Sequence, residues 1–210
     1  MSHITKNLAQ IKAKLTENVN LIAVSKTKPI DDIKSAIEAG QLIFGENKVQ
    51  EAQEKFTILK EQYPKIQLHL IGKLQTNKVK KAVAIADFIH CVDSQKLADE
   101  ISKEAKKQQK NPQIFIQVNI GDEQQKSGIE IENVENLVKY CQKLDLNLIG
   151  LMCIPPANSN PTPYFALLAK IAKENNLQNM SMGMSSDWQD AINFGANYIR
   201  VGSAIFGERN

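Results

Sequence analysis

The chain has 210 residues, a length that fits one domain of the size of an α/β barrel. Its 42% hydrophobic and 23% charged residues are typical of a globular protein, and a net charge of +3 with mixed signs is too small to indicate nucleic-acid binding. No apolar run reaches the about 18 residues that a membrane span needs, and no segment resembles a signal peptide, so we expect no membrane partner.

Three cysteines, Cys91, Cys141 and Cys153, are widely spaced and odd in number. They form no disulfide framework and no metal-ligand spacing, which favours a reducing compartment and predicts no metal site. Cys91 and Cys153 have no evident base partner, and we interpret them as small buried residues rather than nucleophiles. Because no linker or low-complexity segment divides the sequence, we expect a single cytoplasmic domain over residues 1–210.

Apolar residues at helical spacing between Ile4 and Leu15 predict an N-terminal helix. Short apolar runs bounded by turn residues then predict eight strands, at residues 21–25, 42–44, 67–71, 88–92, 114–120, 146–152, 179–182 and 198–201. Helical patterns alternate with them. They lie at residues 31–40, 48–61, 131–144, 164–175 and 187–194, with one further helix that ends at residue 86 and two that begin at residues 95 and 203. This alternation predicts an α/β fold, a single (β/α)₈ TIM barrel with an extra N-terminal helix. A doubly wound sheet is the alternative, but no Gly-rich fingerprint follows the first strand.

Lys26 directly follows the first predicted strand, at the barrel end where such folds gather their chemistry. Loss of water around an ammonium favours its neutral form, and a neutral amine can form a Schiff base with an aldehyde. The alternative is a strand-end lysine that extends its side chain into solvent.

The predicted loops after strands seven and eight lie at the usual phosphate corner of this fold, and they contain Ser185, Gly202 and Ser203. Gly202 and Ser203 open a helix whose free N–H groups favour an anion. Each residue has a simpler interpretation, since Gly202 also suits a tight turn and Ser185 also suits a helix cap. An amine facing a phosphate cradle is the combination that a phosphorylated aldehyde requires.

Three further polar residues fall on predicted strands or strand ends. Asn47 follows the second strand, where it also suits a helix cap. Arg200 lies in the eighth strand, where it could pair with a carboxylate on the barrel rim. His69 lies in the third strand and is more typical of a core histidine than of a base.

Several ordered motifs, from about residue 4 to the C-terminus, resemble those of the pyridoxal 5′-phosphate homeostasis proteins, single-domain relatives of the alanine racemase N-terminal barrel. The motifs are Ala23–Pro29, Phe44–Glu51, His69–Lys78, Gln117–Ile120, Lys126–Gly128, Gly150–Pro155, Ser181–Ser185 and Arg200–Gly207. Two positions differ from the family pattern: Ser203 replaces the usual threonine and keeps the hydroxyl, and Leu68 replaces a frequent aromatic residue.

The resemblance implies a fold-type III site for pyridoxal 5′-phosphate (PLP). It implies that Lys26 holds the cofactor as an internal aldimine and that Arg200 faces the pyridine nitrogen. It also places Asn47 beside the ring and Ser185, Gly202 and Ser203 around the phosphate. No residue is assigned a catalytic role.

Two arguments favour a PLP carrier over an enzyme. A guanidinium at Arg200 opposes protonation of the pyridine nitrogen and weakens the cofactor as an electron sink. The tyrosine that completes two-base racemisation in alanine racemase belongs to a second domain, which we do not find in these 210 residues. We therefore expect a PLP-binding protein of intracellular vitamin B6 homeostasis, a monomer with PLP-dependent apoenzymes as possible partners. A single-domain PLP-dependent amino-acid racemase is the alternative, and a protein with a vestigial cofactor site is a third interpretation.

Overall fold

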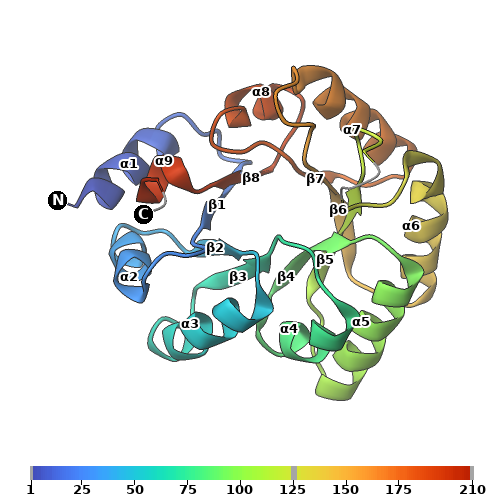
Figure 1. The fold of residues 1–210 in the computed structure, drawn as a ribbon, viewed down its shortest axis with the longest axis horizontal. Helices are drawn as coiled ribbons and strands as arrows, with labels where there is room; N and C mark the ends of the chain where they lie inside the picture. The colour runs from blue at the N-terminus through green and yellow to red at the C-terminus, as the bar shows by residue number, and fades with distance from the viewer. Residues whose placement is uncertain (1, 124–126, 209–210) are drawn as a thin grey trace.

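The computed structural model describes residues 2–123 and 127–208, and its centre is a closed barrel of eight parallel strands (Figure 1). The strands pair in chain order, and β1 closes the barrel against β8 with Ile22 opposite Arg200. The predicted (β/α)₈ barrel is therefore confirmed. The strands are β1 (Asn20–Val24), β2 (Ile43–Glu46), β3 (Gln67–Leu70), β4 (Phe88–Val92), β5 (Gln113–Val118), β6 (Leu148–Cys153), β7 (Asn179–Ser181) and β8 (Tyr198–Val201).

Helices surround the barrel, and the predicted extra helix α1 precedes the first strand. The first and last helices lie side by side (Figure 1), where Asn7 Nδ2 donates to the carbonyl of Ile205 at 3.0 Å. The helices are α1 (His3–Lys12), α2 (Ile30–Glu38), α3 (Val49–Gln62), α4 (Val79–Ile85), α5 (Gln95–Gln108), α6 (Val134–Lys143), α7 (Thr162–Glu174), α8 (Trp188–Asn193) and α9 (Ser203–Phe206), with short 3₁₀ turns η1 (Thr76–Lys78) and η2 (Ile131–Asn133).

The main core lies between the strands and the helix layer. Each helix buries one apolar stripe there, as α3 does with Ala52, Phe56 and Leu59. α5 has a side-chain cap, since Ser94 Oγ accepts a hydrogen bond from Leu97 N at 3.3 Å. None of the helices in the described ranges is long and apolar enough to cross a membrane.

A smaller aromatic core fills the barrel itself. Phe88 stacks on His69 with ring centroids 3.9 Å apart, and Phe115 stacks on His90 at 4.3 Å. Tyr198 contacts the ring of Phe115 edge-on at 5.2 Å. The interior is thus packed with side chains, as expected for a barrel of this type.

Two strands, β2 and β5, end two residues away from the predicted position. β2 continues past Phe44 to Glu46, because Gly45 and Glu46 pair with His69 and Leu70 of β3. A glycine is needed at position 45, where a Cβ would come within 2.8 Å of the Ile22 side chain. β5 ends at Val118 rather than Ile120.

Candidate functional site

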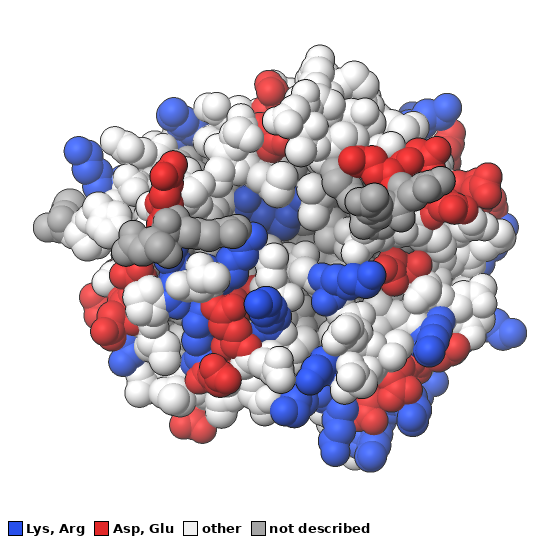
Figure 2. Space-filling model, viewed as in Figure 1, with Lys and Arg blue, Asp and Glu red and all other residues white. Residues whose placement is uncertain are grey.

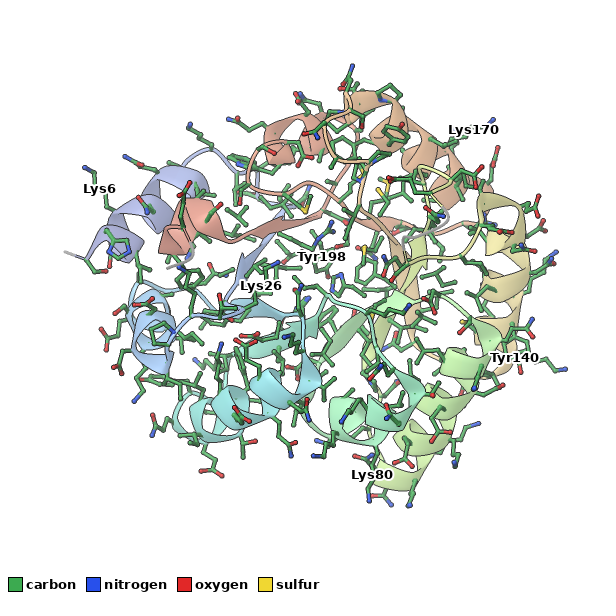
Figure 3. All side chains as sticks on the ribbon, in the orientation of Figure 1. Lys6, Lys26, Lys80, Tyr140, Lys170 and Tyr198 are labelled. Carbon is green, nitrogen blue, oxygen red and sulfur yellow. The ribbon has the colours of Figure 1, made fainter. Side chains whose placement is uncertain are left out.

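Lys26 lies at the carboxyl end of the barrel, two residues after β1 (Figure 3). It lines a cavity of about 180 Å³ between the ends of β1, β7 and β8. The space-filling view of this face shows a hollow near its centre with lysine and arginine side chains around it (Figure 2). The other residues that line the cavity are Val24, Lys28, Ser185, Gly202, Ser203 and Gly207.

Three sequence-predicted residues therefore share this cavity with Lys26. Ser185 Oγ accepts a hydrogen bond from Gly202 N at 3.3 Å, so the loop after β7 is joined to the loop after β8. Ser203 opens α9, and the first amides of a helix have no partner within it. Two serines and the start of a short helix thus line the cavity together with Lys26.

The simpler interpretation of Ser185 is wrong, and the turn at Gly202 is close to β1. Ser185 caps no helix, because α8 begins at Trp188 after Asp187. Gly202 has φ of −117°, so the turn itself does not require glycine. A Cβ at position 202 would instead lie 3.4 Å from both the Cβ and the carbonyl oxygen of Val24.

The turn that presents Lys26 is fixed from the helix layer by Glu46, Glu51 and Lys55, which we call the Lys55 cluster. Lys55 Nζ donates to Glu51 Oε1 at 2.6 Å, to Glu46 Oε1 at 3.2 Å and to the carbonyl of Ser25 at 3.0 Å. Ser25 Oγ donates to Glu46 Oε1 at 2.7 Å. Burial raises the pKa of the Glu46 carboxyl, against the opposing effect of Lys55.

The Lys55 cluster also holds the residue after Lys26. Thr27 has a left-handed backbone with φ of 63°, and its N–H donates to Glu51. Sequence reasoning missed this support. The available signal was a glutamate at i and a lysine at i+4 on the predicted helix, facing a buried strand.

Lys28 Nζ donates to the carbonyls of Phe206 at 3.3 Å and Glu208 at 2.8 Å. These bonds fasten the loop after β1 to the C-terminal helix. Lys28 and Lys26 line the same cavity, but Lys28 is directed to backbone oxygens at its edge.

Arg200 lies inside the barrel and is 4% exposed. Its Nη1 donates to Ser181 Oγ at 2.7 Å, and its Nη2 donates to the carbonyl of Cys153 at 2.9 Å. Burial lowers the pKa of the guanidinium. Among the described residues it forms no ion pair, so the alternative of a rim carboxylate partner is wrong.

Asn47 lies across the mouth from the Ser185 corner and lines a second cavity, of about 280 Å³. Buried Gln117 lines it too, and its Nε2 donates to the carbonyl of Ser127 at 3.0 Å. The residue that caps α3 is Lys48, so Asn47 is not the helix cap. Of the motif at residues 126–128, Lys126 lies outside the described residues.

His69 is a core histidine, as its sequence context indicates. Its Nδ1 lies 2.9 Å from Nε2 of His90, a residue that sequence reasoning missed. Burial, with a contribution from the charge of Lys60, lowers the pKa of His69 to about 3. Neither ring is therefore a base at neutral pH, because burial also places the pKa of His90 well below its ordinary value.

The three cysteines, Tyr140 and Tyr198 are not among the residues that line the Lys26 cavity. Cys91, Cys141 and Cys153 are buried free thiols, and burial raises the pKa of each to about 12. Tyr140 lies on the outer surface (Figure 3) and donates to Asp99 Oδ1 at 2.7 Å. Tyr198, which sequence reasoning overlooked, points into the barrel among the aromatic rings.

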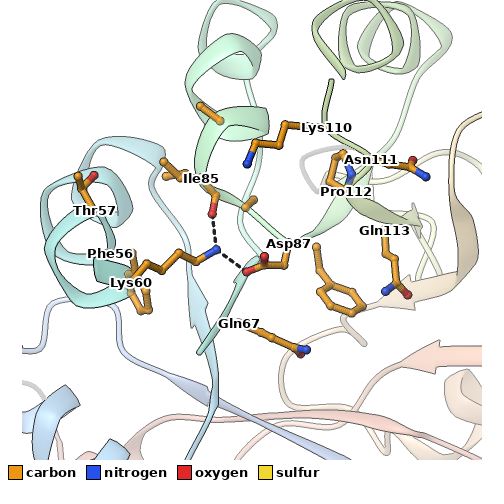
Figure 4. A pocket seen from close by; sticks show the side chains of 13 residues that line it. Phe56, Thr57, Lys60, Gln67, Ile85, Asp87, Lys110, Asn111, Pro112 and Gln113 are labelled. Atoms are coloured by element: carbon orange, nitrogen blue, oxygen red, sulfur yellow. Dashed lines mark hydrogen bonds and ion pairs between the residues drawn. The ribbon is translucent and has the colours of Figure 1, made fainter. Parts of the chain in front are cut away.

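A larger cleft, of about 520 Å³, opens at the amino end of the barrel (Figure 4). Its central cation is already bound: Lys60 Nζ donates to Asp87 Oδ2 at 2.6 Å and to the carbonyl of Ile85 at 2.8 Å. Asp87 Oδ2 also accepts from Leu68 N at 2.7 Å. These contacts join α3, α4 and the starts of two strands.

Comparison with known proteins agrees with this arrangement. The family model for the N-terminal domain of alanine racemase matches residues 1–210. A pyridoxal phosphate homeostasis protein of Aquifex aeolicus (strain VF5) is 40% identical over 199 residues, which are 90% of this chain and 86% of that protein.

Two solved structures of PipY from Synechococcus elongatus PCC7942 are also similar. The structure without PLP is 38% identical, with a TM-score of 0.93 over 97% of this chain and 100% of that one. The structure with PLP bound is 36% identical, with a TM-score of 0.90 and the same coverage. The chain belongs to the pyridoxal phosphate homeostasis protein family, within the alanine racemase N-terminal barrels.

Proposed function

We propose that this protein binds pyridoxal 5′-phosphate at the carboxyl end of its barrel and serves in the homeostasis of that cofactor. The observation that supports this best is the shared cavity of about 180 Å³, in which Lys26 faces Ser185, Gly202 and Ser203. PipY, which has been solved with PLP bound, supports the same ligand for this chain.

The chemistry of the cavity fits this ligand. PLP has an aldehyde, which needs an amine, and a phosphate, which needs hydrogen-bond donors. Lys26 supplies the amine, and the hydroxyl groups of Ser185 and Ser203 supply donors. When bound, the cofactor supplies an electron sink for amino-acid chemistry.

In this proposal Asn47 and Arg200 contact the ring rather than the phosphate. Both lie outside the lining of the 180 Å³ cavity, Asn47 across the mouth and Arg200 at the floor. Because an arginine stays protonated at any ordinary pH, it opposes a proton on the pyridine nitrogen and weakens the electron sink. That favours storage and delivery of the cofactor over rapid turnover.

The proposal also covers the domain organisation, oligomeric state, location and partners of the protein. Residues 1–210 act as one domain and work as a monomer in the cytoplasm, where buried free thiols stay reduced. The partners are PLP-dependent apoenzymes that receive the cofactor. Light scattering of the purified protein tests the monomer, and transfer of PLP to an apoenzyme across a dialysis membrane tests whether contact is needed.

The decisive experiment is reductive trapping of added PLP with borohydride, followed by peptide mapping. We expect the label at Lys26 and its complete loss in Lys26→Ala. Lys80→Ala, which changes an exposed lysine on α4 (Figure 3), is the matched control and should label as the unaltered protein does. A label on another lysine, or no label, would contradict the proposal.

The same samples test the racemase alternative. Exchange of the α-proton of alanine or serine in deuterated water should not exceed that caused by free PLP. Exchange well above that level, lost in Lys26→Ala, would instead establish an enzyme.

A further inference from the structure

Four buried polar side chains form one hydrogen-bonded chain across the barrel interior, from β8 to β7, β4 and β3. Arg200 Nη1 donates to Ser181 Oγ at 2.7 Å, and Ser181 Oγ lies 2.9 Å from His90 Nδ1. His90 Nε2 in turn lies 2.9 Å from His69 Nδ1. Ser181, His90 and His69 are 0% exposed, so protein atoms alone determine the chain.

Arg200 sets the first link of the chain. A guanidinium only donates, so the hydroxyl of Ser181 accepts there, and in the proposed proton order it donates its own proton to His90 Nδ1. His90 then has its proton on Nε2 and donates it to Nδ1 of His69. His69 has its proton on Nε2, an atom with no partner among the described residues. In this order, the accepting atom of each of the three residues lies on the side nearer to Arg200 along the chain.

The aromatic core fixes both rings in this arrangement. His69 stacks on Phe88 with an interplanar angle of 10°, and His90 stacks on Phe115 at 22°. Both imidazoles are neutral, since burial lowers their pKa values. Aligned neutral hydrogen bonds polarise one another, and here they place the negative ends of their dipoles next to a cation that has been removed from water.

The same contacts limit what the guanidinium can do. A guanidinium has five N–H donors, and two of them are used by Ser181 and the Cys153 carbonyl. The plane of the group is thereby fixed from two strands, β6 and β7. A fixed plane determines how the remaining donors are presented to any ring bound above it.

We propose that Ser181, His90 and His69 are positioning residues, which hold Arg200 charged and in a fixed plane against the ring of the bound cofactor. This inference rests on the proposed PLP function for its consequence. The proton order along the chain exists without the cofactor. None of the three side chains lines either of the two cavities that contain Lys26 and Asn47, so each acts through Arg200.

The proton order is tested first, in the full chain without cofactor. Nitrogen NMR of the histidine-labelled protein distinguishes the two neutral tautomers of each ring. We expect His69 and His90 to be neutral with the proton on Nε2 between pH 6 and 8, and Ser181→Ala to alter the His90 signals. A proton on Nδ1 of His90 would overturn the proposal, whatever PLP does.

The consequence is tested in the PLP-loaded protein by following the absorbance of the bound cofactor against pH. With the chain broken in Ser181→Ala or His90→Phe, the ring nitrogen should gain its proton about one pH unit higher, a ten-fold change in that equilibrium. The amide of His90→Gln can both accept and donate, so this variant should titrate close to the pH of the unaltered protein. The double variant Ser181→Ala/His90→Phe should match Ser181→Ala alone, because the chain is already cut at Arg200.

Two readouts separate failure of this inference from failure of the proposed function. Borohydride labelling of Lys26 shows whether PLP binds, and the fluorescence of the single tryptophan, Trp188, during denaturation shows whether each variant folds. If the wild-type protein is not labelled at Lys26, the proposed function is contradicted. Folded, labelled variants with an unchanged titration overturn the positioning role. If His90→Phe does not fold, Ser181→Ala alone tests the positioning role. It removes a single oxygen atom, so we expect it to fold.

Discussion

At the amino end of the barrel, Lys60 binds Asp87 and a helix carbonyl, and its charge is used to join neighbouring elements. At the carboxyl end, Lys26 shares a cavity with the hydroxyls of Ser185 and Ser203 and with the start of a helix. The amino-end cleft is the larger of the two, about 520 Å³ against about 180 Å³. Of these two cavities, the larger is the one whose polar groups already pair with each other, so volume does not identify the site.

The difference lies in what the polar groups are paired with. In the cleft, cation and carboxylate satisfy each other, so a ligand would have to compete with them. At the mouth, the ion pairs of the Lys55 cluster lie behind the Lys26 turn, in the helix layer. The groups that face the cavity are thus held from outside it, which is how a binding site keeps its geometry.

The largest expected effect comes from breaking that outer support with Lys55→Met. Glu46 is fully buried, its Oε2 has no partner in the described part of the chain, and Lys55 is its cation. An unpaired buried carboxylate costs about 3–5 kcal/mol of unfolding free energy. Guanidinium denaturation followed by tryptophan fluorescence measures the loss, and PLP labelling of Lys26 should weaken with it.

The matched control for this variant is Lys139→Met, which breaks an exposed pair with Glu135 on α6 and should leave the denaturation midpoint unchanged. The double variant Lys55→Met/Glu46→Gln should recover part of the loss, because it removes the buried charge. Equal midpoints for Lys55→Met and Lys139→Met would show that the Lys55 cluster does not stabilise the turn.

The second prediction concerns the core between the two ends. The pKa of His69 is lowered to about 3 and that of His90 lies well below its ordinary value. As the pH falls, both histidines are therefore protonated in the unfolded chain before they are protonated in the folded protein. Their contribution to stability is complete above about pH 6.5 and is lost as the pH falls. The unfolding free energy should fall as the pH decreases below about 6.5, with a slope that approaches about 1.4 kcal/mol per pH unit for each histidine.

Denaturation midpoints between pH 7 and pH 5 measure this slope, above the range where most carboxylates titrate. His90→Gln should reduce the slope, and His3→Gln, which changes an exposed residue of α1, should not. A slope that is the same in both variants would show that the buried histidines do not cause it.

The sequence predicts the barrel because every strand has a local signal, a short apolar run between turn residues. It also places Lys26 and the Ser185 corner together, since residues at the ends of parallel strands converge. Glu46, Lys55, Ser181 and His90 were missed for a different reason. Each is polar within an apolar strand or a helix, and its partner lies on another element in a register that only the closed barrel sets.

Returning to the mouth, the third prediction is that Ser185→Ala weakens PLP binding about ten-fold. The variant removes one hydroxyl from the proposed phosphate corner, and a hydrogen bond to a charged group contributes about 1.5 kcal/mol. The matched control is Ser186→Ala, an exposed neighbour outside the cavity. Titration of each protein with PLP measures the affinities, and equal values would exclude Ser185 from the site.

The smallest effect is expected at the amino end, where Lys60→Met should lower the unfolding free energy by about 1 kcal/mol and leave PLP affinity unchanged. The pair that it breaks is partly exposed, with side chains 27% and 40% accessible, so solvent replaces much of what is lost. The same two measurements on Ser185→Ala should give a different pattern, weaker binding together with the small loss of stability expected from one hydrogen bond. If Lys60→Met weakens PLP binding as Ser185→Ala does, the two ends are coupled through the barrel core, and the cleft belongs to the functional site after all.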